Sequence, residues 1–109
     1  MEKVCKTSDI AIGTMKGFTV NQKQVLVANV DGTFYAVDAV CSHRSGYLVK
    51  GKLDKNIIIC PVHGARFDVT TGKVTKDLPG LMKMMTNGGA KDLNSYKVEI
   101  KDGAIFVDA

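Results

Sequence analysis

The stretch Cys41-Ser-His43, followed after a spacer of sixteen residues by Cys60-Pro-Val-His63-Gly-Ala-Arg-Phe67, decides how this chain is organised. The protein has only two histidines, and each follows a cysteine at short spacing, once as Cys-x-His and once as Cys-x-x-His. Cysteine thiolate and neutral imidazole are the side chains that hold borderline and soft transition metals. Two short loops, each offering one sulfur and one nitrogen, therefore predict a four-ligand metal site. Its ligands are Cys41, His43, Cys60 and His63.

The composition is that of one ordinary domain. The chain has 109 residues, of which 45% are hydrophobic and 24% charged, as is typical of a globular fold. No stretch approaches the roughly 18 apolar residues of a membrane-spanning helix. The charged start at Glu2 and Lys3 does not resemble a signal peptide, which needs an apolar segment. We therefore expect a soluble, cytoplasmic protein that does not bind membranes.

The cysteine count and the net charge narrow the interpretation further. An odd count of three cysteines argues against a disulfide framework. With two of them as metal ligands only Cys5 is left, and we interpret it as a half-buried strand residue. A net charge of +4 would suit nucleic acid, but the basic residues are scattered and aromatic residues are few. The sequence therefore favours a solvated surface, or a docking face for an acidic partner. We do not expect the protein to bind nucleic acid.

Turn signals between β-forming runs predict an all-β fold. Asp31-Gly32 and Asp102-Gly103 each separate two such runs, and Asp-Gly is a strong hairpin signal because glycine accepts positive φ. The expected strands are residues 2–12, 17–20, 24–30, 33–37, 57–60, 65–69, 73–74, 96–100 and 104–107, with further turns at 53–56 and 71–72. No strong helical period is present, which agrees with a fold built from strands.

The ligand set matches a two-iron, two-sulfur centre with two cysteines on one iron and two histidines on the other. With this spacer, the two motifs resemble those of Rieske iron–sulfur proteins, and specifically the small soluble Rieske ferredoxins. The resemblance implies one 2Fe-2S cluster per chain in a single Rieske domain. It further implies an antiparallel β-sandwich base, residues 1–38 and 76–109, and a small inserted cluster-binding subdomain at about residues 39–75.

The resemblance also assigns roles to single residues. It implies that Cys41 and Cys60 bind the inner iron, while His43 and His63 bind the outer iron near solvent. The remaining assignments are Leu48 as an apolar side chain that shields the cluster, Gly64 as a position of close backbone approach, and Leu78-Pro79-Gly80 as a proline loop. Residues 80–95 look like an insertion, either a surface loop with methionines packed on the sheet or a partner-docking lip.

Departures from the high-potential members of the family predict a low reduction potential. Those members have a disulfide between the loops, whereas this chain has Gly46 (or Ser45) and Val62 at the corresponding places. They also place a serine and a tyrosine hydroxyl on the cluster sulfurs, where this chain has Ala65 and Phe67. Fewer donors destabilise the reduced state, so we expect roughly −150 to 0 mV, within a Rieske range of about −150 to +300 mV.

The function implied by the resemblance is one-electron transfer without catalysis by the chain itself. A reductase would supply the electron, and an oxygenase or another redox partner would accept it from a monomer or weak oligomer. Arg44, Lys50 and Arg66 either steer acidic partners or are ordinary surface charges. A carrier for a different redox pathway is a second possibility.

Two further classes remain as alternatives. Structural zinc usually takes Cys-x₂₋₄-Cys and His-x₃₋₅-His, a spacing that this chain does not follow. A Cys–His nucleophilic enzyme needs one thiol and one base, and it explains neither the second pair nor the absence of a leftover histidine.

Overall fold

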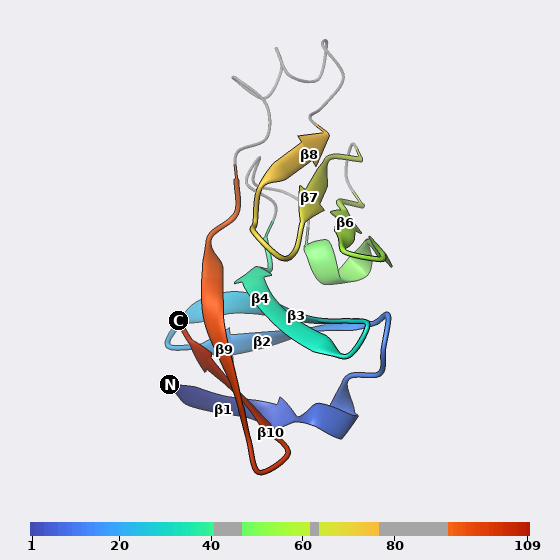
Figure 1. The fold of residues 1–109 in the computed structure, drawn as a ribbon. Coiled ribbons are helices and arrows are strands. Elements are labelled where there is room, and N and C mark those ends of the chain that lie inside the picture. Colours follow the sequence, from blue (N-terminus) through green and yellow to red (C-terminus); the bar gives the residue numbers. More distant parts are fainter. Residues whose placement is uncertain (41–46, 62–63, 77–91) are drawn as a thin grey trace.

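The computed structural model describes residues 1–40, 47–61, 64–76 and 92–109. These residues form two antiparallel sheets and two short 3-10 helices, with no α-helix among them (Figure 1). One sheet has six strands in the order β1-β10-β9-β4-β3-β2, and the other has four in the order β5-β6-β7-β8. The predicted all-β fold is confirmed.

The elements follow one another along the chain with these bounds. They are β1 (Glu2–Lys6), η1 (Thr7–Asp9), β2 (Met15–Val20), β3 (Lys23–Val30), β4 (Thr33–Asp38), η2 (Leu48–Lys50), β5 (Lys52–Asp54), β6 (Ile57–Ile59), β7 (Arg66–Asp68), β8 (Val74–Lys76), β9 (Ser95–Lys101) and β10 (Ala104–Asp108).

Both Asp-Gly hairpins form where the sequence predicts them. Val30 pairs with Thr33 across the first turn, in which Asp31 and Gly32 have φ of 53° and 93°. The second turn joins β9 to β10. Because both central residues of the first turn have positive φ, the turn twists with its flanking strands, and the register of the β3–β4 hairpin follows.

Two predicted boundaries are wrong. The first strand ends at Lys6 instead of continuing to residue 12, because the Asp9 carboxylate accepts the N–H of Lys6 at 2.9 Å and the chain turns into η1. The predicted turn at 53–56 shrinks to its last two residues, since Lys52–Asp54 form β5.

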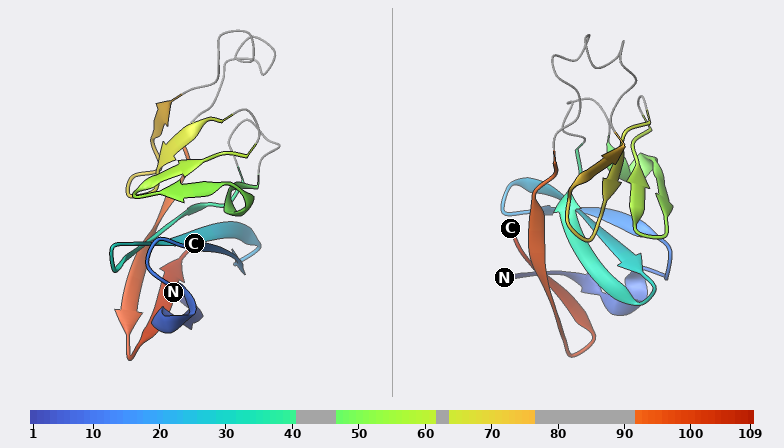
Figure 2. Two further views of the ribbon diagram at one scale, coloured as in Figure 1. Left: turned by 90° about the vertical axis from the view of Figure 1, so that its right-hand side faces the viewer. Right: turned by 45° about the horizontal axis from the view of Figure 1, so that its top comes forward.

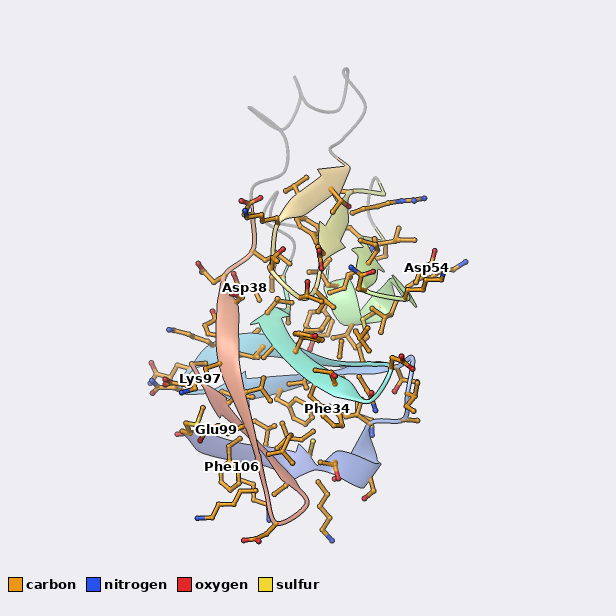
Figure 3. All side chains as sticks on the ribbon, viewed as in Figure 1. Phe34, Asp38, Asp54, Lys97, Glu99 and Phe106 are labelled. Atoms are coloured by element: carbon orange, nitrogen blue, oxygen red, sulfur yellow. The ribbon has the colours of Figure 1, made fainter. Side chains whose placement is uncertain are left out.

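The six-stranded sheet folds over itself, so that β1 and β10 lie below β2, β3 and β4, while β9 runs from beside β4 down to β10 (Figures 1 and 2). Between these layers lies the lower core, whose buried members are Ile10, Val20, Val25, Val27, Ala36, Ile105 and Val107. Phe34 packs against this lower core from the β3–β4 hairpin (Figure 3). The base is therefore a β-sandwich, as the sequence predicts.

Strand β3 is buried on both faces, because successive side chains of a strand point to opposite sides. Val25 and Val27 belong to the lower core, whereas Leu26 and Ala28 belong to a second, upper core under the four-stranded sheet. The other buried members of the upper core are Val37, Ala39, Leu48, Ile58, Cys60, Ala65, Phe67, Val69 and Leu93. The predicted ligand Cys60 thus lies at the contact between the two sheets.

The two ends of the chain lie side by side at the base. Glu2 pairs with Val107 across β1 and β10, and the side-chain amide of Asn21 donates to the Ala109 carbonyl at 3.3 Å. Figure 1 shows both ends below β6–β8. The termini are therefore remote from the second ligand motif.

Candidate metal centre

The first ligand loop starts and ends on paired backbone. Val40 and Tyr47 form an antiparallel bridge, and the N–H of Leu48 donates to the Ala39 carbonyl at 2.8 Å. The predicted ligands Cys41 and His43 lie between these two ends, outside the described residues. The chain therefore leaves the end of β4 and returns beside it.

The second ligand loop lies between two neighbouring strands, β6 and β7. Cys60 follows β6, and its N–H donates to the carbonyl of Ala65 at 2.8 Å, just before β7 begins. Gly64 has a φ of +75°, a conformation that other residues rarely adopt. This hydrogen bond closes the loop, and because it uses the N–H of Cys60, that group is not free to donate to a cluster sulfur.

The ends of the two loops meet at Gly51, which follows η2. A Cβ on Gly51 would overlap the carbonyl oxygen of Ile59 and approach the Pro61 side chain to 3.1 Å. Gly51 also donates its N–H to the Leu48 carbonyl at 2.9 Å. The return of the first loop therefore runs directly against the start of the second, and only glycine fits between them.

The surroundings of Cys60 suit a buried metal thiolate. Cys60 is 2% exposed and shares the upper core with Leu48, Ala65 and Phe67, each fully buried. A thiolate in such apolar surroundings is costly unless a positive centre binds it. Neither Ala65 nor Phe67 brings a hydroxyl to this core. The donor chemistry thus fits an iron–sulfur centre.

Of the four predicted ligands, the structure describes only Cys60. Within the described residues no three metal-binding side chains come together. The other predicted site features outside those residues are His63, Arg44, Ser45, Gly46, Val62, Leu78-Pro79-Gly80 and most of the 80–95 insertion. The complete ligand set therefore stays a prediction.

Cys5 is the half-buried strand residue that the sequence predicts. It pairs with Ile105 in the register of β1 and β10 and is a free thiol of intermediate exposure. Burial and, to a smaller degree, the charge of Asp9 raise the pKa of its thiol. A raised thiol pKa makes Cys5 a poor nucleophile and metal ligand at neutral pH.

The sequence did not reveal a hydrogen-bonded junction where the chain leaves the base. One oxygen of the Asp38 carboxylate accepts the Tyr96 hydroxyl at 2.5 Å, and the other accepts the N–H of Asn94 at 2.7 Å. Asp38 lies beside the upper end of β9 (Figure 3). Partial burial, followed by the bond to Asp38, raises the pKa of Tyr96 to about 12. Because Asp38 and Tyr96 are far apart in sequence, no local motif predicts this contact.

Among the described residues, no helix has the length and apolar character to cross a bilayer.

Comparison with known proteins identifies the family. The family model of the Rieske [2Fe-2S] domain matches residues 1–97. The chain is 37% identical over 86 residues to the ferredoxin component of biphenyl 2,3-dioxygenase from Rhodococcus jostii (strain RHA1), covering 79% of each protein. It is 35% identical over 101 residues to the ferredoxin component of a naphthalene 1,2-dioxygenase system from Pseudomonas putida, covering 93% of this chain and 88% of that relative.

A solved structure agrees with these sequence matches. It is a chain from the complex of reduced oxygenase and oxidised ferredoxin in carbazole 1,9a-dioxygenase, which superimposes with a TM-score of 0.82 at 31% identity, covering 98% of this chain and all of that one.

The chain belongs to the Rieske [2Fe-2S] domain family. It carries a 2Fe-2S cluster and is an electron carrier of the ferredoxin kind, because the relatives are ferredoxin components and not the catalytic parts of their systems. The alternative of a structural zinc domain finds no support among these matches.

Proposed function

We propose that this protein is the ferredoxin component of an oxygenase system, which takes one electron from a reductase and delivers it to an oxygenase. The observation that carries the proposal is the match over 93% of the chain to the ferredoxin component of a naphthalene 1,2-dioxygenase system. The likeness to a chain of an oxygenase–ferredoxin complex supports it. A carrier for a different redox pathway is the alternative.

We assign the four ligands to Cys41, His43, Cys60 and His63. The supporting observations are the burial of Cys60 and the contact at Gly51, which brings the ends of both ligand loops together. A bound 2Fe-2S cluster supplies a centre that gains and loses one electron. Leu48 is suited to its assigned shielding role, because it is fully buried in the same core as Cys60.

We also propose that the domain divides into a base, residues 1–38 and 76–109, and a cluster-binding subdomain at about 39–75. The division is supported by the strands, since β1–β4, β9 and β10 form one sheet and β5–β8 form the other; at the boundary, Lys76 is the last residue of β8 and thus belongs to the four-stranded sheet. In this division, the chain crosses from the first part to the second at Asp38, the residue that Tyr96 and Asn94 hold.

A low reduction potential follows from the side chains around the second loop. Ala65 and Phe67 are both fully buried and neither offers a hydroxyl, so no such donors stabilise the added electron. We expect a value of roughly −150 to 0 mV, at the low end of the Rieske range. A spectroelectrochemical titration gives this value directly, and a midpoint above about +100 mV would contradict it.

A cytoplasmic location is also proposed, because the free thiol of Cys5 suits a reducing compartment. Fractionation of the producing cells, with the cluster absorbance followed in each fraction, tests it.

The ligand assignment is tested by single Cys→Ser and His→Ala variants at the four positions. Each is expected to reduce iron and sulfide from two per chain toward zero, whereas Cys5→Ser, the matched control, keeps both. An EPR spectrum of the dithionite-reduced protein reports mixed cysteine and histidine ligation. Zinc in place of iron, or a full cluster in Cys60→Ser, would contradict the assignment.

The role as an oxygenase component is tested by exchanging whole proteins in a known oxygenase system. This protein replaces the native ferredoxin in a mixture of the reductase and oxygenase components of the naphthalene 1,2-dioxygenase system, and product formation is measured. Turnover that depends on this protein and is lost in Cys60→Ser supports the role. A protein with an intact cluster that supports no turnover here, nor with the biphenyl 2,3-dioxygenase components, favours the carrier for a different pathway.

A further inference from the structure

The positive charge of the protein is concentrated in one part of the chain. Residues 39–94, which lie between β4 and β9, hold nine of the fifteen basic residues but only four of the eleven acidic ones. The net charge of +4 therefore comes from this part, while the strands of the base are close to neutral. The sequence shows scattered basic residues, and the fold brings several of them onto one sheet.

A row across the four-stranded sheet is basic at three of its four positions. Lys52 of β5 pairs with Ile59 of β6, Ile59 pairs with Arg66 of β7, and Arg66 pairs with Lys76 of β8. We call Lys52 and Arg66, the two exposed basic residues that flank Ile59, the cationic row.

The cationic row lies on the outer side of the sheet. The next row, Leu53–Ile58–Phe67–Val74, is apolar and packs into or against the upper core. Neighbouring residues of a strand point to opposite faces, so Lys52 and Arg66 point away from that core. Both side chains are exposed, and Ile59 between them is partly exposed.

This row lies at the end of the sheet that carries the second ligand loop. Ile59 immediately precedes Cys60, and Arg66 immediately follows Ala65, the residue whose carbonyl accepts the N–H of Cys60. No other row of this sheet is closer to Cys60 along the chain. Charge at these positions therefore acts where a partner must approach to exchange an electron.

The acidic residues of the same face lie at its other end. Asp54 and Asp68 flank Ile57 in the row two residues farther from Cys60 (Figure 3 labels Asp54). The Asp68 carboxylate is occupied within its own loop, since Asn56 and the N–H and hydroxyl of Thr70 all donate to it. Lys55 follows Asp54, and the Lys73 carbonyl accepts the N–H of Asp68, so positive and negative charges are mixed at that end, while the cationic row beside the ligand loop is positive.

We propose that the cationic row is a docking surface for an acidic patch on a redox partner protein. The inference rests on the proposed electron-carrier function and adds the sign and place of the contact. Opposite charges steer encounter and raise association rates by factors of about 10 to 1,000, and they fix the orientation in which the partners meet. On the outer face of the described part of this sheet, the apolar neighbours of the row are Ile57 and Ile59 and none is aromatic, which favours a protein surface over stacked bases of nucleic acid.

The test uses two small oxidants of opposite charge on the reduced protein. Stopped-flow spectrophotometry follows cluster oxidation by hexacyanoferrate(III), an anion, and by tris(phenanthroline)cobalt(III), a cation. In the double variant Lys52→Glu/Arg66→Glu, we expect the anion to react about tenfold more slowly at low ionic strength and the cation to react faster. Both differences are expected to vanish near 1 M salt, where screening extends over only about 3 Å.

A matched control separates local from overall charge. The double variant Lys97→Glu/Lys101→Glu changes the net charge equally on β9 of the base, and it is expected to alter both rates by less than about twofold. The neutral double variant Lys52→Gln/Arg66→Gln is expected to fall between native and reversed proteins, and it serves where charge reversal impairs folding. Equal effects at the two places would overturn the proposal.

A polymer competitor tests the class of partner. Poly-L-glutamate is expected to slow the reaction of the native protein with hexacyanoferrate(III) but not that of Lys52→Glu/Arg66→Glu. Inhibition by duplex DNA without inhibition by poly-L-glutamate would instead identify a nucleic-acid surface and overturn the proposal.

Iron and EPR measurements on every sample keep the two hypotheses apart. A native protein without a cluster overturns the electron-carrier function and the docking surface with it. A native protein with a full cluster, whose oxidation rates do not depend on Lys52 and Arg66, overturns the docking surface alone.

Discussion

The first ligand loop is closed between the two sheets, whereas the second is closed within one of them. At the first loop, Val40 forms a bridge with Tyr47, and the N–H of Leu48 donates to the Ala39 carbonyl. These contacts join the end of β4 to η2, which lies beneath the four-stranded sheet. At the second, Cys60 bonds to Ala65 between adjacent strands. The second loop thus depends on a local hairpin, while the first depends on how the layers pack.

This difference has a consequence for assembly. A hairpin such as β6–β7 forms from contacts close in sequence, whereas the first loop needs its layers packed before its ends meet. Changes in the packing between the sheets are therefore expected to disturb the first loop more than the second. Four substitutions test the comparison, from the largest effect to the smallest.

Leu48→Ala should cause the largest loss. Leu48 is fully buried at the end of the first loop, and truncating a buried leucine costs about 2–5 kcal/mol in the free energy of unfolding. Chemical denaturation measures the loss, and iron analysis reports the cluster. A loss below about 1 kcal/mol would show that the first loop does not depend on the packing between the sheets.

Gly51→Ala should rank second. The new methyl group meets the backbone carbonyl of Ile59, which cannot move without displacing β6, and such overpacking costs about 1–3 kcal/mol. Gly17→Ala is the matched control, because there the methyl group meets the Tyr47 hydroxyl, the end of a side chain that can rotate. Thermal unfolding and cluster retention compare the two. Equal losses would mean that the two loops do not meet rigidly at Gly51.

Tyr96→Phe should weaken the junction on the base side by about 1 kcal/mol, the net contribution of one hydrogen bond. The pH dependence gives a second readout. The pKa of Tyr96 rises from 10.0 to about 12 on folding, so its contribution is complete below pH 10 and is lost as the pH rises toward 12. Denaturation at pH 9 and pH 11 should show a smaller alkaline loss in the variant than in the native protein. An identical alkaline loss in both would contradict this role.

Asp68→Asn should have the smallest effect. Asp68 organises the turn between β7 and β8, at the end of β7 that is remote from Cys60. Burial alone would raise the pKa of Asp68, but hydrogen bonds from Thr70 and Asn56 lower it below 3.8. Its contribution is therefore present above pH 4 and is lost as the pH falls below that value. We expect a loss of at most about 1 kcal/mol at pH 7, smaller at pH 3 than at pH 7, with an unchanged reduction potential. A shifted reduction potential would show that the turn after β7 is coupled to the ligand loop before β7.

The sequence predicts most of the base, since its signals are local. Asp31-Gly32 and Asp102-Gly103 fix two hairpins because each turn depends on its own residues. The first strand is overpredicted, because the contact of Asp9 with the N–H of Lys6 competes with strand formation. Alternation alone could not reveal that β3 is buried on both faces, since this depends on the sheet packed above it.

The features of the candidate site also divide into those that the sequence predicts and those that only the fold shows. Short spacing within each ligand pair and the apolar neighbours of Cys60 are visible in the sequence. The contact of Gly51 with Ile59 and the bonds of Asp38 to Tyr96 and Asn94 join residues from separate elements, so no motif announces them. The cationic row likewise appears only when strand register places Lys52, Ile59 and Arg66 side by side.

The neighbouring ends of the chain make this protein suitable for oriented attachment. Glu2 and Val107 pair at the base, and β6–β8 lie at the opposite end of the molecule (Figure 1). A cysteine-free linker added after Ala109 and coupled to an electrode would leave the Cys60 side facing the solution. Such a film would present the same face to every partner in the liquid, while the electrode current would require a mediator to reach the cluster.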